Sequence, residues 1–180
     1  SAQKRFRQSL ENFANIFISA NKLDKDVVDL LLPRLKDEYN AFYFYRAASN
    51  WCQGVGYFKA AEFFAKESED ELGHAKKIEQ YLVDWNVDPE LPTVERPQIV
   101  FSGLMEVIEN AYTIEYALYE DYEGTSKEMF KKDLCVFDFL QEFRMLQKQA
   151  VAEYSDKLNM LEGVDGKDKF KLLLLEKKLF

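Results

Sequence analysis

The sequence predicts an all-α fold: an antiparallel four-helix bundle with a long crossover, a short C-terminal fifth helix and an extra N-terminal helix. Helix breakers are scarce, because the 180 residues include only 7 Gly and 4 Pro, while 47% of the residues are apolar. Apolar residues also recur at alternating steps of three and four in four long segments, which is the spacing of one helix face. These two observations favour packed helices over sheets or disorder.

The N-terminal segment, residues 1–22, reads as an amphipathic helical extension that precedes the bundle. Its apolar residues are spaced to lie on one helix face, which predicts packing against another surface. They are Phe6, Leu10, Phe13 and Phe17.

The bundle itself is expected over residues 23–162, beginning after Asp24 as an N-cap. The first long helix runs to Cys52 with a kink at Pro33, and residues 53–56 connect it to a second helix over 57–86. The linker that follows holds three prolines, which no helix tolerates at that density, and it is long enough to cross the length of a bundle.

The second half of the bundle contains two further long helices. Ser102 is the expected cap of a helix that runs to Gly124, and the last long helix covers Lys127 to Glu162. Residues 163–180 begin with a glycine-containing break and end in a short helix.

Charge and cysteine content limit the partners. The net charge of −8 without a basic patch argues against nucleic acid and against an anionic membrane, and favours cations. Cys52 and Cys135 form no Cys-x-x-Cys pattern, so neither a thiolate zinc site nor a disulfide framework is indicated, which suits a cytoplasmic protein. No apolar run approaches the roughly 20 residues of a membrane span.

Polar residues interrupt the apolar stripe of each long helix near its middle. A carboxylate on such a stripe loses several kcal/mol of solvation unless it is paired, protonated or bound to metal, so several helices with this feature suggest one shared site. Glu71 and His74 are spaced i, i+3, and Glu-x-x-His is a recurring element of dimetal sites in four-helix bundles. The interrupting residues are Glu38, Glu67, Glu71, His74, Glu115, Arg144 and Gln147.

Plainer interpretations of the same residues stay open. His74 and its neighbours also fit a solvated charged face, and Gln147 also fits an ordinary core amide. Tyr45 is either a core tyrosine with a satisfied hydroxyl or a redox participant. Arg144 suits a subunit contact or a partner for one of the carboxylates, and Glu67 an access carboxylate or a half-exposed residue.

Together these residues resemble the non-haem ferritins from about residue 24 to 180. The resemblance rests on Glu38, Tyr45 seven residues later, the pair Trp51-Cys52, Glu-Leu-Gly-His at 71–74, Glu115 and Gln147. It implies a first metal position formed by Glu38, Glu71 and His74. Glu71 then bridges to a second metal that Glu115 also binds, with Gln147 as a nearby amide.

Departures from the family pattern carry further implications. Bacterial ferritins have more glutamates on the last long helix, where this chain has Leu146, Gln149 and Ala150, so a third iron site is not expected. Gln147 followed by Ala150 is instead similar to animal heavy-chain ferritins. Leu72 stands where bacterioferritins have a haem-ligating methionine, so no haem is expected. The segment Leu172 to Leu175 resembles the helix that lines the fourfold pore of a 24-subunit cage.

The resemblance thus implies an iron-storage subunit that oxidises Fe(II) with dioxygen at two irons per subunit, with Tyr45 as an electron or hydrogen-bond donor. A shell subunit that stores iron without fast oxidation is the alternative, motivated by the missing glutamates of the last helix. A dimanganese or iron–manganese oxidase on the same bundle is a third, because the ligand set does not determine the metal.

Overall fold

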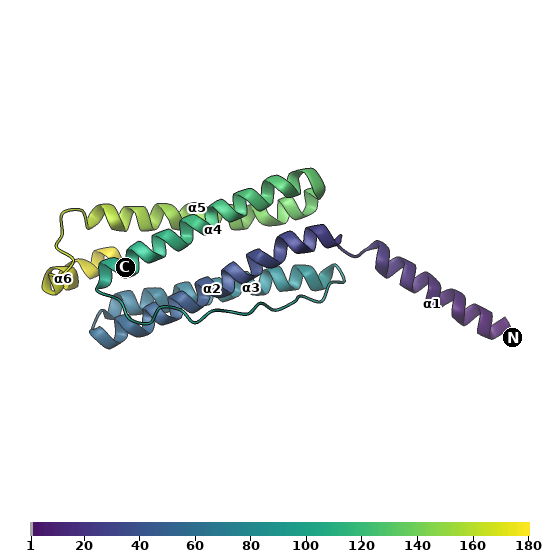
Figure 1. Ribbon diagram of the computed structural model, residues 1–180, viewed down its shortest axis with the longest axis horizontal. Coiled ribbons are helices and arrows are strands. Elements are labelled where there is room, and N and C mark those ends of the chain that lie inside the picture. Colours follow the sequence, from purple (N-terminus) through teal and green to yellow (C-terminus); the bar gives the residue numbers. More distant parts are fainter. Residues whose placement is uncertain (1) are drawn as a thin grey trace.

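The computed structural model describes the backbone of residues 2–180 and the side chains of residues 2–14 and 21–180. Within this part of the chain all regular structure is helical (Figure 1), and no helix is long and apolar enough to cross a membrane. The helices are α1 (Ala2–Ala20), α2 (Lys25–Val55), α3 (Phe58–Asp84), α4 (Leu104–Lys132), α5 (Leu134–Met160) and α6 (Lys169–Leu179).

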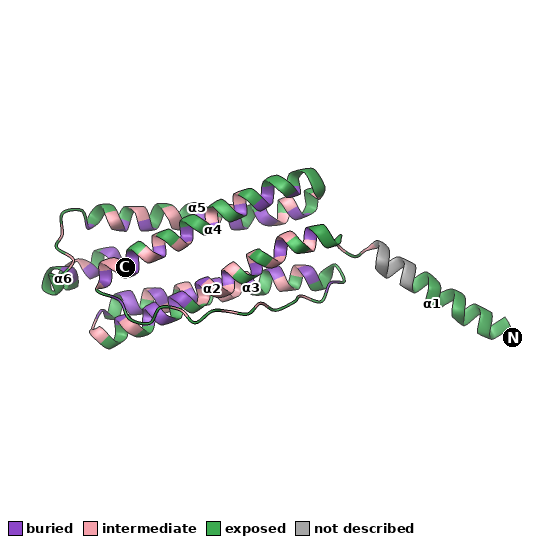
Figure 2. Ribbon diagram, viewed as in Figure 1, coloured by how far each residue is buried: buried purple, intermediate pink, exposed green. Residues whose placement is uncertain are grey.

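Helices α2 to α5 form the bundle, as two hairpins laid side by side (Figure 1). Helix α2 pairs with α3 and α4 pairs with α5, while the non-helical segment 85–103 runs along the length of the first hairpin to connect them. The predicted all-α bundle with a long crossover is confirmed, and the inward faces of its helices are buried (Figure 2).

The turn between α2 and α3 sets these two helices antiparallel. Gly56 has φ 92°, a left-handed conformation that favours glycine, and the Tyr57 N–H donates to the Cys52 carbonyl at 2.9 Å. Helix α2 therefore continues three residues past the predicted end at Cys52, to Val55. Because the turn is tight, residues near the middle of α2 face residues near the middle of α3.

The helix boundary predicted between Gly124 and Lys127 is wrong, since α4 continues through both residues to Lys132. A single glycine inside a helix costs only about 1 kcal/mol, which the packing of α4 against α5 outweighs. The chain turns at Asp133, whose backbone is extended and whose side chain accepts the Val136 N–H at 3.1 Å. Asp133 is therefore the N-cap of α5.

The predicted cap of α4 is also displaced. Gly103, not Ser102, is the N-cap residue, and no side chain bonds there as a conventional cap. Instead the Glu106 carboxylate accepts the backbone N–H of Ser102 at 2.5 Å, which resembles half of a capping box.

Helix α1 projects from the end of the bundle (Figure 2), and its described apolar side chains are exposed. Phe6, Leu10 and Phe13 are 67%, 52% and 68% exposed, so these side chains are not part of the core of the bundle. Phe17 belongs to the same predicted face, but its side chain lies outside the described residues.

Helix α6 docks on the turn between α2 and α3. The buried Glu176 carboxylate accepts the Ala60 N–H at 2.9 Å, near the N-terminus of α3, and Lys169 Nζ donates to the Val55 carbonyl at the C-terminus of α2. Each side chain thus places its charge at the helix end of opposite partial charge.

Candidate metal centre

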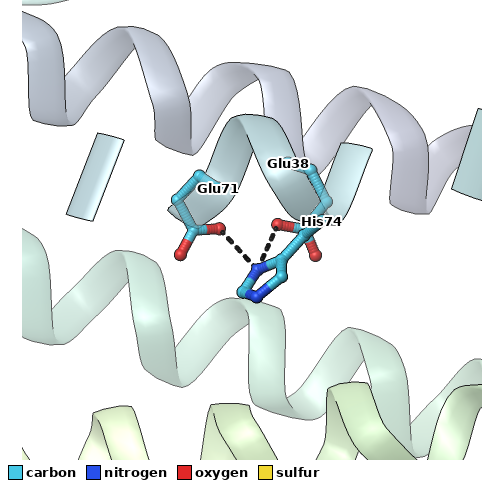
Figure 3. Close-up of side chains that lie close together, drawn as sticks. All are labelled: Glu38, Glu71 and His74. Atoms are coloured by element: carbon cyan, nitrogen blue, oxygen red, sulfur yellow. Dashed lines mark ion pairs between the residues drawn. The ribbon is translucent and has the colours of Figure 1, made fainter. Parts of the chain in front are cut away.

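Glu38 from α2 and Glu71 and His74 from α3 converge in the middle of the first hairpin (Figure 3). One potential ligand atom from each residue lies within 4.8 Å of the other two. His74 Nδ1 is 3.5 Å from an oxygen of Glu38 and 3.5 Å from an oxygen of Glu71. The i, i+3 spacing on α3 places Glu71 and His74 on one face, and the antiparallel turn brings Glu38 to the same point.

The atoms that face one another at this point lack hydrogen-bond partners. In the described part of the chain, the buried side-chain nitrogen and oxygen atoms without a partner are Glu38 Oε2, Glu71 Oε2, His74 Nδ1 and Tyr154 Oη. An unpaired buried polar group of this kind costs about 1–3 kcal/mol, and more when charged. A cation bound by the first three atoms accounts for all three together.

Interactions among Glu38, Glu71 and His74 shift the pKa values of all three side chains. Burial, and then the neighbouring Glu38, raise the pKa of Glu71 well above its usual value. Burial acts in the same direction on Glu38, but interactions with His74 and Glu71 hold its pKa below the usual value. For His74, burial lowers the pKa and the Glu38 carboxylate more than reverses this. A divalent cation would displace the protons that these groups hold.

Glu115 and Gln147 lie on the second hairpin, on α4 and α5, and are buried. The Tyr45 hydroxyl donates to Glu115 Oε1, and Gln147 Nε2 donates to Glu115 Oε2 at 2.6 Å. Both oxygens of Glu115 are therefore engaged, and Glu115 does not belong to the three-residue cluster. Burial raises its pKa to about 6, against the bonds from Tyr45 and Gln147.

Tyr122 of α4 is a residue of the site that the sequence did not single out. Its hydroxyl donates to Glu38 Oε1, which leaves Oε2 facing His74. The signal was present in its spacing, because Tyr122 follows Glu115 by two helical turns on the same stripe. A tyrosine on the buried face of a helix can be a hydrogen-bond donor to a carboxylate or an ordinary core residue, and its spacing alone does not tell which.

An acidic groove of about 470 Å³ leads from the surface to the cluster, between α3 and α5. Lys77 is the only lysine or arginine in its lining, and the groove reaches His74 and Gln147. Burial, followed by nearby carboxylates, raises the pKa of Glu67 to about 7. The carboxylate residues in the lining are Glu67, Glu69, Asp70, Glu71 and Glu153.

Arg144, expected at a subunit contact or beside a site carboxylate, has other partners. Its guanidinium donates to Ser126 Oγ at 2.7 Å and to the Phe137 carbonyl at 3.1 Å, and it stacks over the Phe137 ring. Arg144 therefore ties α4 to α5 near Asp133 and contacts none of the site carboxylates.

Comparison with known families decides the classification. Residues 28–164, most of the chain, match the family model described as the ferritin-like domain. The chain belongs to the ferritin family. A curated relative from Haemophilus influenzae, named a probable bacterial non-heme ferritin-like protein, is 31% identical over 87% of this chain and 95% of its own length. A bacterial non-heme ferritin from Staphylococcus aureus is 28% identical over the same shares.

Solved structures agree on the ferritin fold. An open-pore ferritin from Archaeoglobus fulgidus superposes with a TM-score of 0.81 at 22% identity, covering 88% of this chain and 97% of its own. An engineered closed form of the same ferritin gives 0.80 at 21% identity. The family resemblance inferred from Glu38, Glu71 and His74 is thereby confirmed at the level of family and fold.

Proposed function

We propose that this chain is an iron-storage subunit that oxidises Fe(II) to Fe(III) with dioxygen at a two-iron centre within the subunit. The first position comprises Glu38, Glu71 and His74, and the second comprises Glu71, Glu115 and the nearby amide of Gln147. Iron is here substrate and cargo, and no haem takes part. Membership of the ferritin family supports the storage role, and the acidic groove supports access by cations.

The observation that carries the proposal is the coincidence of two independent features. In the described part of the chain, three of the four buried side-chain polar atoms without a hydrogen-bond partner belong to Glu38, Glu71 and His74, the residues whose ligand atoms lie close enough to share one ion. Two carboxylates and an imidazole form a donor set that suits Fe(II), though it does not select iron over manganese.

The chemistry balances as two one-electron steps. Each Fe(II) gives one electron, and dioxygen takes up both electrons with two protons to leave as hydrogen peroxide. Protons displaced from Glu71 and His74 during iron binding are available for this uptake. The Tyr45 hydroxyl donates a hydrogen bond to Glu115, so it holds that carboxylate in position.

The storage part of the proposal is a homo-oligomeric cage, of 24 subunits, that holds the ferric product as mineral in the cytoplasm. Its support is the family, the superposition on ferritins and the docked C-terminal helix α6. The proposed domain boundaries are an N-terminal helical extension at 1–22, the four-helix bundle at 23–162 and a segment with the short C-terminal helix at 163–180.

A shell subunit that stores iron without fast oxidation is the second candidate, and one observation favours it. Both oxygens of Glu115 already bond to Tyr45 and Gln147, so the second position is less open than the first. Under this alternative only the first position fills tightly.

Stopped-flow absorbance tests the choice, with metal-free protein mixed aerobically with about two Fe(II) per subunit. His74→Ala removes a ligand of the first position, and Glu115→Ala a ligand of the second. Glu69→Gln is a matched control, because Glu69 lines the same groove but is exposed and belongs to neither position.

A fast phase that saturates near two irons, survives in Glu69→Gln and disappears in the other two variants is the expected result. Slow oxidation in wild type that Glu115→Ala leaves unchanged would favour the shell subunit. Equally slow traces in all four proteins would contradict the ferroxidase proposal.

A further inference from the structure

Glu67 is a carboxylate of the groove to which the two-iron arrangement gives no role. It lies one helical turn before Glu71 on α3, so both side chains are on the same face of the helix. Glu67 lines the groove beside Glu71 and Gln147, and it is only partly exposed. The same stretch of groove therefore carries the bridging carboxylate and, one turn away, a second carboxylate.

No hydrogen bond or ion pair joins Glu67 to any described residue. The charges that act on it are mainly those of Glu115, Glu153 and Asp70, all of the same sign. Lys66 next to it bonds to Asp70 instead, and Lys157 bonds to Glu153. Glu67 thus stands among several carboxylates with only the weaker opposing charge of Lys66, which is a setting in which a divalent cation is stabilising.

Tyr154 of α5 supplies an independent observation at the same place. Its hydroxyl is fully buried and has no hydrogen-bond partner, although its ring stacks on Tyr45 with centroids 6.4 Å apart. Burial raises the pKa of Tyr154, the charges of Glu67 and Glu115 raise it further, and the nearby Tyr45 hydroxyl opposes this, so both carboxylates lie in the neighbourhood of the hydroxyl. Unpaired buried hydroxyls are rare, and this one is available to bond to a further group.

We propose that Glu67 is a metal ligand that swings in from the groove and completes the second iron position with Glu71 and Glu115, facing the Tyr154 hydroxyl. This inference deepens the proposed function, because it names the carboxylate that the second position otherwise lacks. On α5, the positions at which bacterial ferritins carry glutamates are Leu146, Gln149 and Ala150 in this chain. These residues line the groove, and none of them has a carboxylate.

Movement of a side chain is part of this proposal. In the described chain the ligand atoms that converge within 4.8 Å are those of Glu38, Glu71 and His74, and Glu67 is not among them. A glutamate on the wall of an open groove, free of hydrogen bonds, has no bond to break in order to turn toward an ion. Glu115 needs to release only the Gln147 amide to offer Oε2.

Anaerobic titration of metal-free protein with Co(II), followed by calorimetry and by visible absorption, tests Glu67 without requiring any oxidation. Glu67→Gln is compared with Glu69→Gln, which removes the same charge from the same groove. His74→Ala marks the first position. Thermal unfolding of the metal-free variants checks the fold, which Glu67→Gln leaves intact because Glu67 makes no bond.

Wild type and Glu69→Gln are expected to bind two Co(II) per subunit. Glu67→Gln keeps the first with unchanged affinity and binds the second about tenfold or more weakly. Coincident curves for Glu67→Gln and Glu69→Gln overturn the inference, as does a single Co(II) per subunit in wild type. A protein that shows the Glu67-dependent second Co(II) but oxidises no iron loses the ferroxidase proposal and keeps this one.

Discussion

The carboxylate of Glu176 is predicted to hold α6 on the bundle, and its removal should have a measurable effect on stability. Ala60 is the third residue of α3, so its N–H has no partner within the helix and depends on Glu176 Oε1 at 2.9 Å. Glu176 is 6% exposed, so solvent does not readily replace it. Glu176→Ala leaves this N–H unpaired.

The expected loss follows from the nature of the bond. A hydrogen bond to a charged group contributes about 1.5–3 kcal/mol, so Glu176→Ala should destabilise the chain by about 2 kcal/mol. For a chain of this size that corresponds to a fall of about 4–8 °C in Tm. Glu176→Gln keeps an acceptor oxygen and loses the charge, so it should lose about half as much.

The assay is thermal unfolding of metal-free protein at one protein concentration, combined with hydrogen exchange at the Ala60 amide. Lys169→Ala serves as the comparison, because Lys169 also joins α6 to the turn but is exposed, and exposed pairs contribute about 1 kcal/mol or less. If the Tm values of Glu176→Ala and Lys169→Ala coincide and the Ala60 amide stays protected, the capping argument is wrong.

Two further outcomes are expected at the metal centre. The pKa of Glu115 is about 6 in the folded chain, against 4.5 for the unperturbed group. Between pH 4.5 and pH 6 the folded state therefore binds more protons than the unfolded state, and the free energy of unfolding falls as the pH rises through this range. Denaturant titrations of metal-free wild type from pH 4.5 to pH 7 should show a loss of about 2 kcal/mol relative to Glu115→Gln, and parallel pH profiles would contradict this. Tyr122→Phe removes the donor to Glu38 Oε1 and should weaken the first Co(II) about tenfold in the titration described above, with the second unaffected. Equal affinity for the first Co(II) in both proteins would show that the hydroxyl does not orient Glu38.

The order of the long helices was predicted from spacing, and the resemblance to ferritins grouped Glu38, Glu71 and His74, which do converge in the structure. Glu71 and His74 lie on one helix and Glu38 on the next, so periodicity and a tight turn suffice to bring them together. The helix end predicted at Gly124 was wrong, because α4 continues to Lys132. A glycine ends a helix only where packing against other helices does not outweigh the conformational cost of the glycine. The sequence of one helix does not show that packing.

The rest of the site depends on contacts between helices, which spacing does not reveal. Tyr122 of α4 bonds to Glu38 of α2, between the two hairpins, and Gln147 of α5 bonds to Glu115 of α4, within the second hairpin. The Tyr154 hydroxyl lacks a hydrogen-bond partner because of the side chains around it, which the helical spacing of Tyr154 does not reveal. Whether Glu67 is an access carboxylate or a half-exposed residue was open in the sequence; in the structure it is partly exposed and lines the groove, which fits both.

The division of the bundle into two hairpins has a consequence for the order of events during synthesis. Every ligand of the first position lies on α2 and α3, which leave the ribosome before α4 and α5 and need only the turn at Gly56 to meet. Glu115 and Gln147 are joined to this hairpin only after the long crossover has been made and the second hairpin has docked. In the proposed two-iron centre, the ligands of the first position can therefore meet early in folding, whereas the second position is assembled only in the completed bundle.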